Sequence, residues 1–148
     1  MVKETRKLEV LIDQIIDYIN NTPEKELSKK LNPKKWSKKE ILGHLVDSGI
    51  NNLQRFTEIQ FKEKPYQLRS YNQEKLILAN NYQVAKTKDI LDLLVAINKR
   101  IIDIVIFQTN ETLNYEIIYD NEKLNLKYLI EDYVLHLEHH TKQIIEYD

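Results

Sequence analysis

The sequence contains no cysteine among its 148 residues. This excludes a disulfide framework, a thiolate zinc site and a cysteine nucleophile, and it is compatible with a reducing compartment. Long apolar runs are missing as well, because none approaches the roughly 20 residues that a membrane-spanning helix needs. The N-terminal segment also lacks the apolar core of a signal peptide. We therefore expect a cytoplasmic protein with no membrane partner.

Glycine and proline are scarce, with two glycines and three prolines in the chain. A chain so poor in turn residues is typical of a helical protein with few sharp loops. Both glycines, Gly43 and Gly49, fall inside one predicted helix, where each costs roughly 1 kcal/mol relative to alanine. This placement predicts that another part of the molecule approaches the helix closely at these two positions.

Charge of one sign does not dominate, since the formal net charge is −1 while charged residues make up 30% of the chain. Six lysines nevertheless form three pairs between the first two long helices, Lys29-Lys30, Lys34-Lys35 and Lys38-Lys39. Such a cluster suits an anionic ligand or a nucleic acid. Because net charge is near zero and aromatic residues are almost absent from the cluster, we expect no nucleic-acid partner.

Apolar residues at three- and four-residue steps predict four main helices, over about 3–20, 37–61, 87–107 and 125 to the terminus. Ser37 and Glu40 have the spacing of a capping box, and Trp36 with Ile41 that of a hydrophobic staple. Thr22, Asn72 and Thr87 are the other predicted N-caps. Shorter helices are expected over about 24–29 and from residue 72, and a small extended segment over 115–119. The pattern predicts one all-α domain spanning residues 1–148, a four-helix bundle with short extra helices in its connections.

Three of the four histidines lie within five residues, at His136, His139 and His140. On a helix, His136 and His140 project from successive turns toward the apolar face and can chelate one ion. A ring from His44, on the second main helix, would complete three nitrogens and leave coordination positions open. The spacing alone leaves open the alternative of hydrogen-bonded core histidines. The zinc-protease H-E-x-x-H motif and the Glu-x-x-His motif of di-iron bundles are both absent.

A polar stripe runs beside the apolar face of the second main helix, with His44, Asp47, Ser48, Asn51 and Arg55 at three- or four-residue steps. Such a stripe is usually the solvated side of a helix. Here no lysine or glutamate occurs between Glu40 and Glu58, which favours a functional groove.

Two segments together resemble the signatures of the DinB-like superfamily, in its YfiT branch. The first is residues 36–48, Trp-Ser-Lys-Lys-Glu-Ile-Leu-Gly-His-Leu-Val-Asp-Ser, continued by Asn51-Asn52 and Arg55-Phe56. The second is residues 136–144, which follow the form H-x-x-H-H-x-x-Q-I. The resemblance implies an up-down-down-up four-helix bundle that holds one divalent metal through His44, His136 and His140. By the same resemblance, His139 adjoins the site and is not a ligand.

Members of this family have diverse activities, among them metal-dependent hydrolysis and transfer of bacillithiol or mycothiol. The resemblance therefore implies an enzyme whose divalent metal, zinc or nickel, activates water or a low-molecular-weight thiol against a small electrophilic substrate. It also implies a homodimer, the common state in the family. Two alternatives are a non-enzymatic, stress-related metal- or ligand-binding bundle and a plain interaction bundle with core histidines.

Four further residues are candidates for contacts to the ligands or the substrate: Asp47, Asn51, Arg55 and Gln143. Arg55 suits a substrate carboxylate. For each of them the alternative is an ordinary interhelical hydrogen bond or salt bridge.

Overall fold

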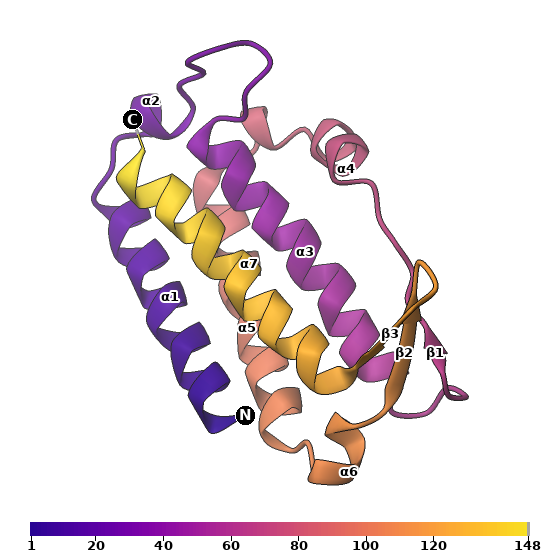
Figure 1. Cartoon of the computed structure of the whole chain (residues 1–148). Coiled ribbons are helices and arrows are strands. Elements are labelled where there is room, and N and C mark those ends of the chain that lie inside the picture. Colours follow the sequence, from indigo (N-terminus) through magenta and orange to yellow (C-terminus); the bar gives the residue numbers. More distant parts are fainter. Residues whose placement is uncertain (148) are drawn as a thin grey trace.

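Four long helices form the body of the molecule in the computed structural model, which describes residues 1–147 (Figure 1). They pack as a closed ring: α1 contacts α5 and α7, and α3, across the ring from α1, contacts the same two helices. The long helices are α1 (Val2–Asn20), α3 (Lys38–Glu58), α5 (Thr87–Ile106) and α7 (Leu126–Glu146). Short elements fill the connections: α2 (Glu24–Leu27), β1 (Tyr66–Gln67), α4 (Gln73–Asn80), η1 (Tyr82–Val84), α6 (Asn110–Leu113), β2 (Glu116–Tyr119) and β3 (Glu122–Asn125).

The chain runs up along α1, down along both α3 and α5, and up again along α7 (Figure 1). Because α3 and α5 run in the same direction, the connection between them must return along the length of the bundle. That return contains β1, α4 and η1. The predicted all-α fold, a four-helix bundle of up-down-down-up topology with short extra helices, is confirmed.

The core lies on the axis of the ring, where the apolar faces of the four long helices meet. Its side chains are mostly leucine and isoleucine, with Phe56 and Tyr133 as the aromatic pair at its lower end, 6.0 Å between ring centroids. Fully buried members from each helix include Leu8, Ile15, Leu42, Leu45, Leu94, Ile101, Ile130 and Leu137.

Both glycines sit where another element touches the backbone of α3, as predicted. A Cβ placed on Gly43 would lie 2.2 Å from the ring of Tyr82, and one on Gly49 would lie 2.8 Å from Cγ2 of Ile97. These distances are too short for two carbon atoms, so the helix gives up propensity at two positions to let η1 and α5 approach it.

The start of α3 is fixed by the predicted capping box. The Ser37 hydroxyl accepts from the backbone N–H of Glu40, and the Glu40 carboxylate accepts from the backbone N–H of Ser37 at 3.0 Å. Asn72 is the N-cap of α4, as predicted, and its side chain accepts from the backbone N–H of Lys75 at 2.9 Å.

Two predicted N-caps were wrong by one residue. Pro23, not Thr22, precedes α2, and the Thr22 hydroxyl instead donates to the backbone carbonyl of Tyr18 at 2.6 Å. Thr87 is the first residue of α5, and its hydroxyl donates to the Glu24 carboxylate at 2.6 Å. In both cases the threonine hydroxyl donates to an oxygen outside the helix that it was predicted to cap.

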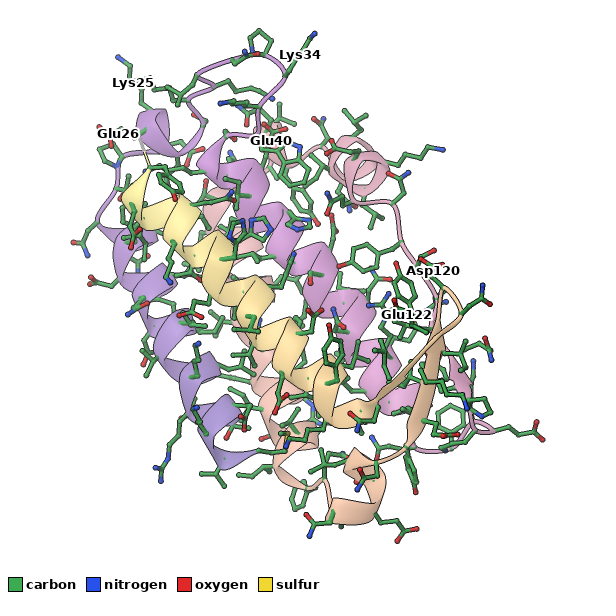
Figure 2. The ribbon with its side chains drawn as sticks, viewed as in Figure 1. Lys25, Glu26, Lys34, Glu40, Asp120 and Glu122 are labelled. Carbon is green, nitrogen blue, oxygen red and sulfur yellow. The ribbon has the colours of Figure 1, made fainter. Side chains whose placement is uncertain are left out.

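A small three-stranded sheet closes the lower end of the bundle, and only part of it was predicted. β2 falls within the expected extended segment, but its partners β1 and β3 were missed. β2 pairs with β3 through a two-residue turn at Asp120 and Asn121, whose φ values are 47° and 65°. Figure 2 shows Asp120 and Glu122 at the tip of this hairpin. Within residues 1–147, no helix has both the length and the apolar character that crossing a membrane would need.

Candidate metal centre

Three histidines meet between α3 and α7, near the end of the bundle where α3 begins. His44 lies on the second turn of α3 and is completely buried, with 0% of its surface exposed. His136 and His140 lie on successive turns of α7 and are half-buried, whereas His139 points into solvent. The capping box that fixes the first residue of α3 therefore also fixes where His44 faces α7.

The rings form a compact triangle. Their centroids are 5.0 Å apart for His44 and His136, 4.7 Å for His44 and His140, and 4.6 Å for His136 and His140. One nitrogen from each ring can be chosen so that all three lie within 4.8 Å of one another. The predicted convergence of imidazoles from two distant helices is thus present in the structure.

The spacing of the nitrogens fits a shared ion. The Nε2 atoms of His44 and His136 are 3.1 Å apart. With metal–nitrogen bonds of about 2.0–2.1 Å, two ligands lie roughly 2.9 Å apart at a right angle and about 3.3 Å apart at the tetrahedral angle. A set of three neutral imidazoles suits zinc, nickel, copper or iron(II). No carboxylate belongs to this cluster in the part of the chain that the structure describes.

Neighbouring side chains orient two of the rings. Gln143, one turn after His140, places its carbonyl oxygen 2.7 Å from Nδ1 of His140. That nitrogen therefore carries the proton, which leaves the lone pair on Nε2 free to face the other rings. The Ser48 hydroxyl lies 3.4 Å from Nδ1 of His136; because a hydroxyl can donate or accept, this contact orients the ring without fixing its proton.

Burial keeps the cluster neutral. It lowers the pKa of His44 to about 3, with the imidazoles of His140 and His136 adding to the effect. Burial likewise lowers the pKa of His136 to about 4. It also lowers the pKa of His140, although the hydrogen bond to Gln143 opposes that shift. Only a neutral imidazole can ligate a metal, so the lone pairs remain available well below neutral pH.

The sequence matches the profile of the DinB superfamily over residues 7–144. The chain belongs to the DinB superfamily. No functionally curated protein matches it significantly.

Two solved structures show the same fold. One is YfiT from Bacillus subtilis, described as a probable metal-dependent hydrolase with an unusual four-helix bundle topology; it is 21% identical, with a TM-score of 0.87 over 97% of this chain and 83% of that one. The other is a mycothiol-dependent maleylpyruvate isomerase, 8% identical, with a TM-score of 0.72 over 96% of this chain and 59% of that one. This DinB-superfamily chain thus spans only about three fifths of the isomerase.

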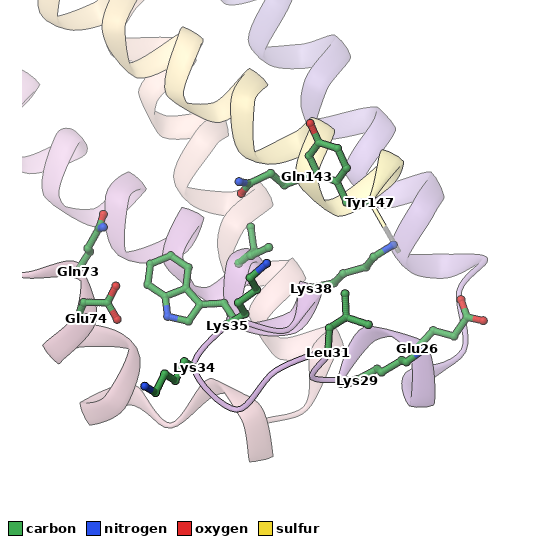
Figure 3. A pocket seen from close by; sticks show the side chains of 12 residues that line it. Glu26, Lys29, Leu31, Lys34, Lys35, Lys38, Gln73, Glu74, Gln143 and Tyr147 are labelled. Atoms are coloured by element: carbon green, nitrogen blue, oxygen red, sulfur yellow. The ribbon is translucent and has the colours of Figure 1, made fainter.

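A pocket of about 530 Å³ lies next to the histidine cluster. Figure 3 shows the side chains that line it. Two of the residues that line the pocket also contact rings of the cluster. Gln143 lines the pocket and contacts His140, while Trp36 lines the pocket and places its ring 5.0 Å from that of His44. A molecule in the pocket would therefore lie against residues that hold two of the three rings.

Among the other predicted site residues of this DinB-superfamily chain, Gln143 is at the cluster, and Asp47 and Asn51 are engaged elsewhere. The Asp47 carboxylate, 3% exposed, accepts from the Tyr82 hydroxyl at 2.5 Å and from the Asn80 amide at 2.9 Å. These partners tie the return connection to α3. The Asn51 amide donates to the backbone carbonyl of Asp47 at 2.9 Å.

Arg55 lies about 16 Å further along the helix axis than His44, since the two are eleven residues apart. Its guanidinium donates to the backbone carbonyl of Arg69 and, at 3.4 Å, to the Asn52 side chain. The ring of Tyr71 lies 5.2 Å from it. The structure therefore places Arg55 in the support of the connection and not beside the histidines.

Sequence reasoning missed the contacts of three side chains: Ser48 and Trp36, which lie against rings of the cluster, and Tyr82, which packs on α3 at Gly43. Ser48 was visible in the polar stripe, one turn after His44, but its partner on α7 was not. Trp36 was assigned only to a hydrophobic staple. Tyr82 follows a connection without periodicity, so no pattern in the sequence could place it on Gly43.

Proposed function

We propose that this DinB-superfamily protein is an enzyme that depends on one divalent metal ion held by His44, His136 and His140. Zinc or nickel is the expected ion. The proposed reaction is attack by water or by a low-molecular-weight thiol on a small electrophilic substrate. The observation that supports it most directly is the 3.1 Å approach of two imidazole Nε2 atoms from helices far apart in sequence.

The number and kind of ligands support an open site. Three protein ligands leave at least one position for a small molecule, as in catalytic rather than purely structural zinc sites. A divalent ion in such a site lowers the pKa of a water or thiol in its open position and so supplies a nucleophile near neutral pH. The pocket that is lined by Gln143 and Trp36 offers space for a small molecule next to the cluster.

The residues of the chain itself prepare the site. Gln143 holds the proton of His140 on Nδ1, and Ser48 steers the ring of His136. The ring of Trp36 packs against that of His44, with 5.0 Å between the centroids. Burial by α3 and α7 keeps His44 and His136 neutral. The ligand set is therefore organised before any ion enters.

Two related structures support the reaction class. YfiT is described as a probable metal-dependent hydrolase, and the isomerase is described as mycothiol-dependent. The proposal therefore includes both water and a thiol as the nucleophile. The similarity to the isomerase rests on fold alone, at 8% identity.

Protein purified without an affinity tag should carry one divalent ion per chain, measured by elemental analysis, and should regain it after chelation and dialysis. The cobalt(II) form should then develop a sulfur-to-cobalt absorption band when 2-mercaptoethanol is added. Release of p-nitrophenolate from p-nitrophenyl acetate should require the metal-loaded form. Protein that neither carries nor regains a metal would refute the proposal.

A non-enzymatic role is the second candidate, because the ligands bridge α3 and α7 and an ion there would cross-link them. In that case the ion would raise the melting temperature strongly. Neither thiol nor ester would change the cobalt spectrum, and no turnover would be seen. The thiol titration and the ester assay therefore distinguish the two candidates.

A further inference from the structure

The six lysines of the three pairs lie in the loop after α2 and in the first turn of α3, and they divide into two groups with different surroundings. Lys30 pairs with Glu40 at 2.8 Å, and Lys39 pairs with Glu24 at 2.7 Å while only 4% exposed. These two charges are neutralised within the fold and hold α2 and the loop against α3.

The other four, Lys29, Lys34, Lys35 and Lys38, all line the pocket beside the histidines. Within residues 1–147, no carboxylate oxygen lies within 4.0 Å of any of their ammonium groups. Figure 3 shows them along the loop and the start of α3, opposite Gln73 and Glu74 on α4.

The pocket as a whole carries a positive charge. Only two carboxylates, Glu26 and Glu74, line it together with the four lysines, which leaves a surplus of two positive charges. A concave wall focuses the field of such charges and raises the local concentration of anions. The surplus is specific to this face, because the chain carries a formal net charge of −1.

The inner wall of the same pocket has a different character. Trp36 and Ile41 provide apolar surface, and Gln143 provides an amide next to His140. The pocket therefore combines a cationic rim with an apolar wall, and it borders the imidazole cluster through Gln143 and Trp36. A volume of about 530 Å³ accommodates a small organic molecule.

We infer that the molecule bound here is a small polyanion, with two or more carboxylate or phosphate groups held at the lysine rim and its reactive end directed toward the histidines. The position of the reactive end rests on the proposed function. The position of the anionic end rests on the pocket alone. It specifies the substrate or cosubstrate class: a compact acid, not a neutral or cationic compound.

The anionic end can be tested on the metal-free protein, so that the result does not depend on the metal. Trp36 is the only tryptophan in the chain and lines the pocket, so its fluorescence reports occupancy directly. Tricarballylate and inorganic pyrophosphate serve as the carboxylate and phosphate probes. Both the response and the affinity should weaken as KCl is raised from about 0.05 to about 0.5 M, because the rim is exposed to solvent and screening shortens the reach of its charges.

The variant Lys34→Gln/Lys35→Gln should bind the better of the two probes about fivefold to tenfold more weakly, since each exposed charge contributes modestly. The matched control, Lys99→Gln/Lys123→Gln, removes two exposed lysines that lie outside the pocket and should bind like the wild type. Absence of any fluorescence response to both probes, or an equal loss in the two double variants, would overturn the inference.

The inner end is tested on the cobalt(II) protein with mercaptosuccinate and its dimethyl ester, which share a thiol and differ in charge. The dianion should produce the sulfur-to-cobalt band at a concentration about tenfold lower than the ester. Equal concentrations would overturn the anionic preference and leave the metal proposal intact. A protein that binds tricarballylate but no metal would refute the proposed function and retain the polyanion site.

Discussion

The two ends of the polar stripe on α3 are both buried, yet their polar atoms have different kinds of partner. At the Arg55 end, the guanidinium donates to a backbone carbonyl and to Asn52, and the Asn52 amide donates to the carbonyl of Ser48 at 2.9 Å. No fully buried nitrogen or oxygen of these two residues lacks a partner within residues 1–147. The hydrogen bonds of Arg55 and Asn52 therefore explain why these polar side chains are buried: they support the fold.

At the His44 end, three rings face one another instead. Nε2 of His44 meets Nε2 of His136. Nδ1 of His44 is buried without a hydrogen-bond partner in the described part of the chain, as is Oδ2 of Asp47 three residues further along α3. Unpaired buried polar atoms are costly, so such a concentration of lone pairs needs an explanation outside the chain. Burial of a polar residue therefore does not mark a site, whereas lone pairs directed at one point do.

The largest difference between the two ends is expected when one of the three proposed metal ligands is replaced. His136→Gln should lower the affinity for zinc by a factor of at least about 100, since each ligand of a protein zinc site contributes on the order of 3 kcal/mol. Competition with a chromogenic chelator measures the affinity. The matched control is His139→Gln, three residues further along α7 and exposed, which should bind zinc like the wild type.

Circular dichroism of both variants checks that the bundle persists. If the two substitutions lower zinc affinity equally, or if neither does, the assignment of the ligands is wrong.

The opposite end should show the opposite response. Arg55→Ala should lower the free energy of unfolding by about 3 kcal/mol, because it removes two charge-assisted hydrogen bonds and leaves the carbonyl of Arg69 without its donor. Zinc affinity should stay unchanged. Urea unfolding of the metal-free protein measures the first quantity and chelator competition the second.

Arg100→Ala provides the control for the arginine substitution. Its ion pair with Asp103 is exposed, and removing it should cost about 0.5 kcal/mol or less. A tenfold fall in zinc affinity in Arg55→Ala would show that the two ends of the stripe are coupled and would contradict the comparison.

Much of this architecture was predictable because it depends on local signals. The capping box at Ser37 and Glu40 fixed the start of α3, and the i, i+4 spacing of His136 and His140 placed two rings on one face of α7. The two glycines indicated a close approach. Each of these signals depends on residues within a few positions of one another, which is the range over which helix geometry determines direction.

What could not be predicted depends on the return connection between α3 and α5. Asp47 was a candidate for the site, but its partners Asn80 and Tyr82 come from α4 and η1, which have no periodicity that fixes their position. The strand β1 has only two residues, too few for alternation to be recognised, and β3 does not alternate buried and exposed residues. Non-local packing decides such features, and only coordinates reveal it.

Lowering the pH should reduce the free energy of unfolding through the histidines at the His44 end. The folded pKa values of His44 and His136 are about 3 and about 4, below the value of about 6.5 for histidine in an unfolded chain. Between these limits the unfolded state binds more protons than the folded state, so stability falls as the pH falls from 6.5 toward 4. We expect a loss on the order of 2 kcal/mol between pH 7 and pH 5 for the metal-free protein.

Urea titrations at each pH measure this loss, and the double variant His44→Gln/His136→Gln should show a flatter profile over the same range. A steeper or unchanged slope in the double variant would mean that other groups carry the pH dependence.

The smallest expected effect concerns Gln143, which contacts His140 and lines the pocket. Gln143→Leu removes the acceptor that keeps the proton of His140 on Nδ1, so part of the population should shift that proton to Nε2 and lose the ligating lone pair. Zinc affinity should fall about tenfold, the usual scale for a residue that orients a ligand. Gln143→Glu retains an acceptor at the same place and should bind zinc at least as tightly as the wild type, so an equal loss of affinity in the two variants would contradict the role of Gln143 as the acceptor for His140.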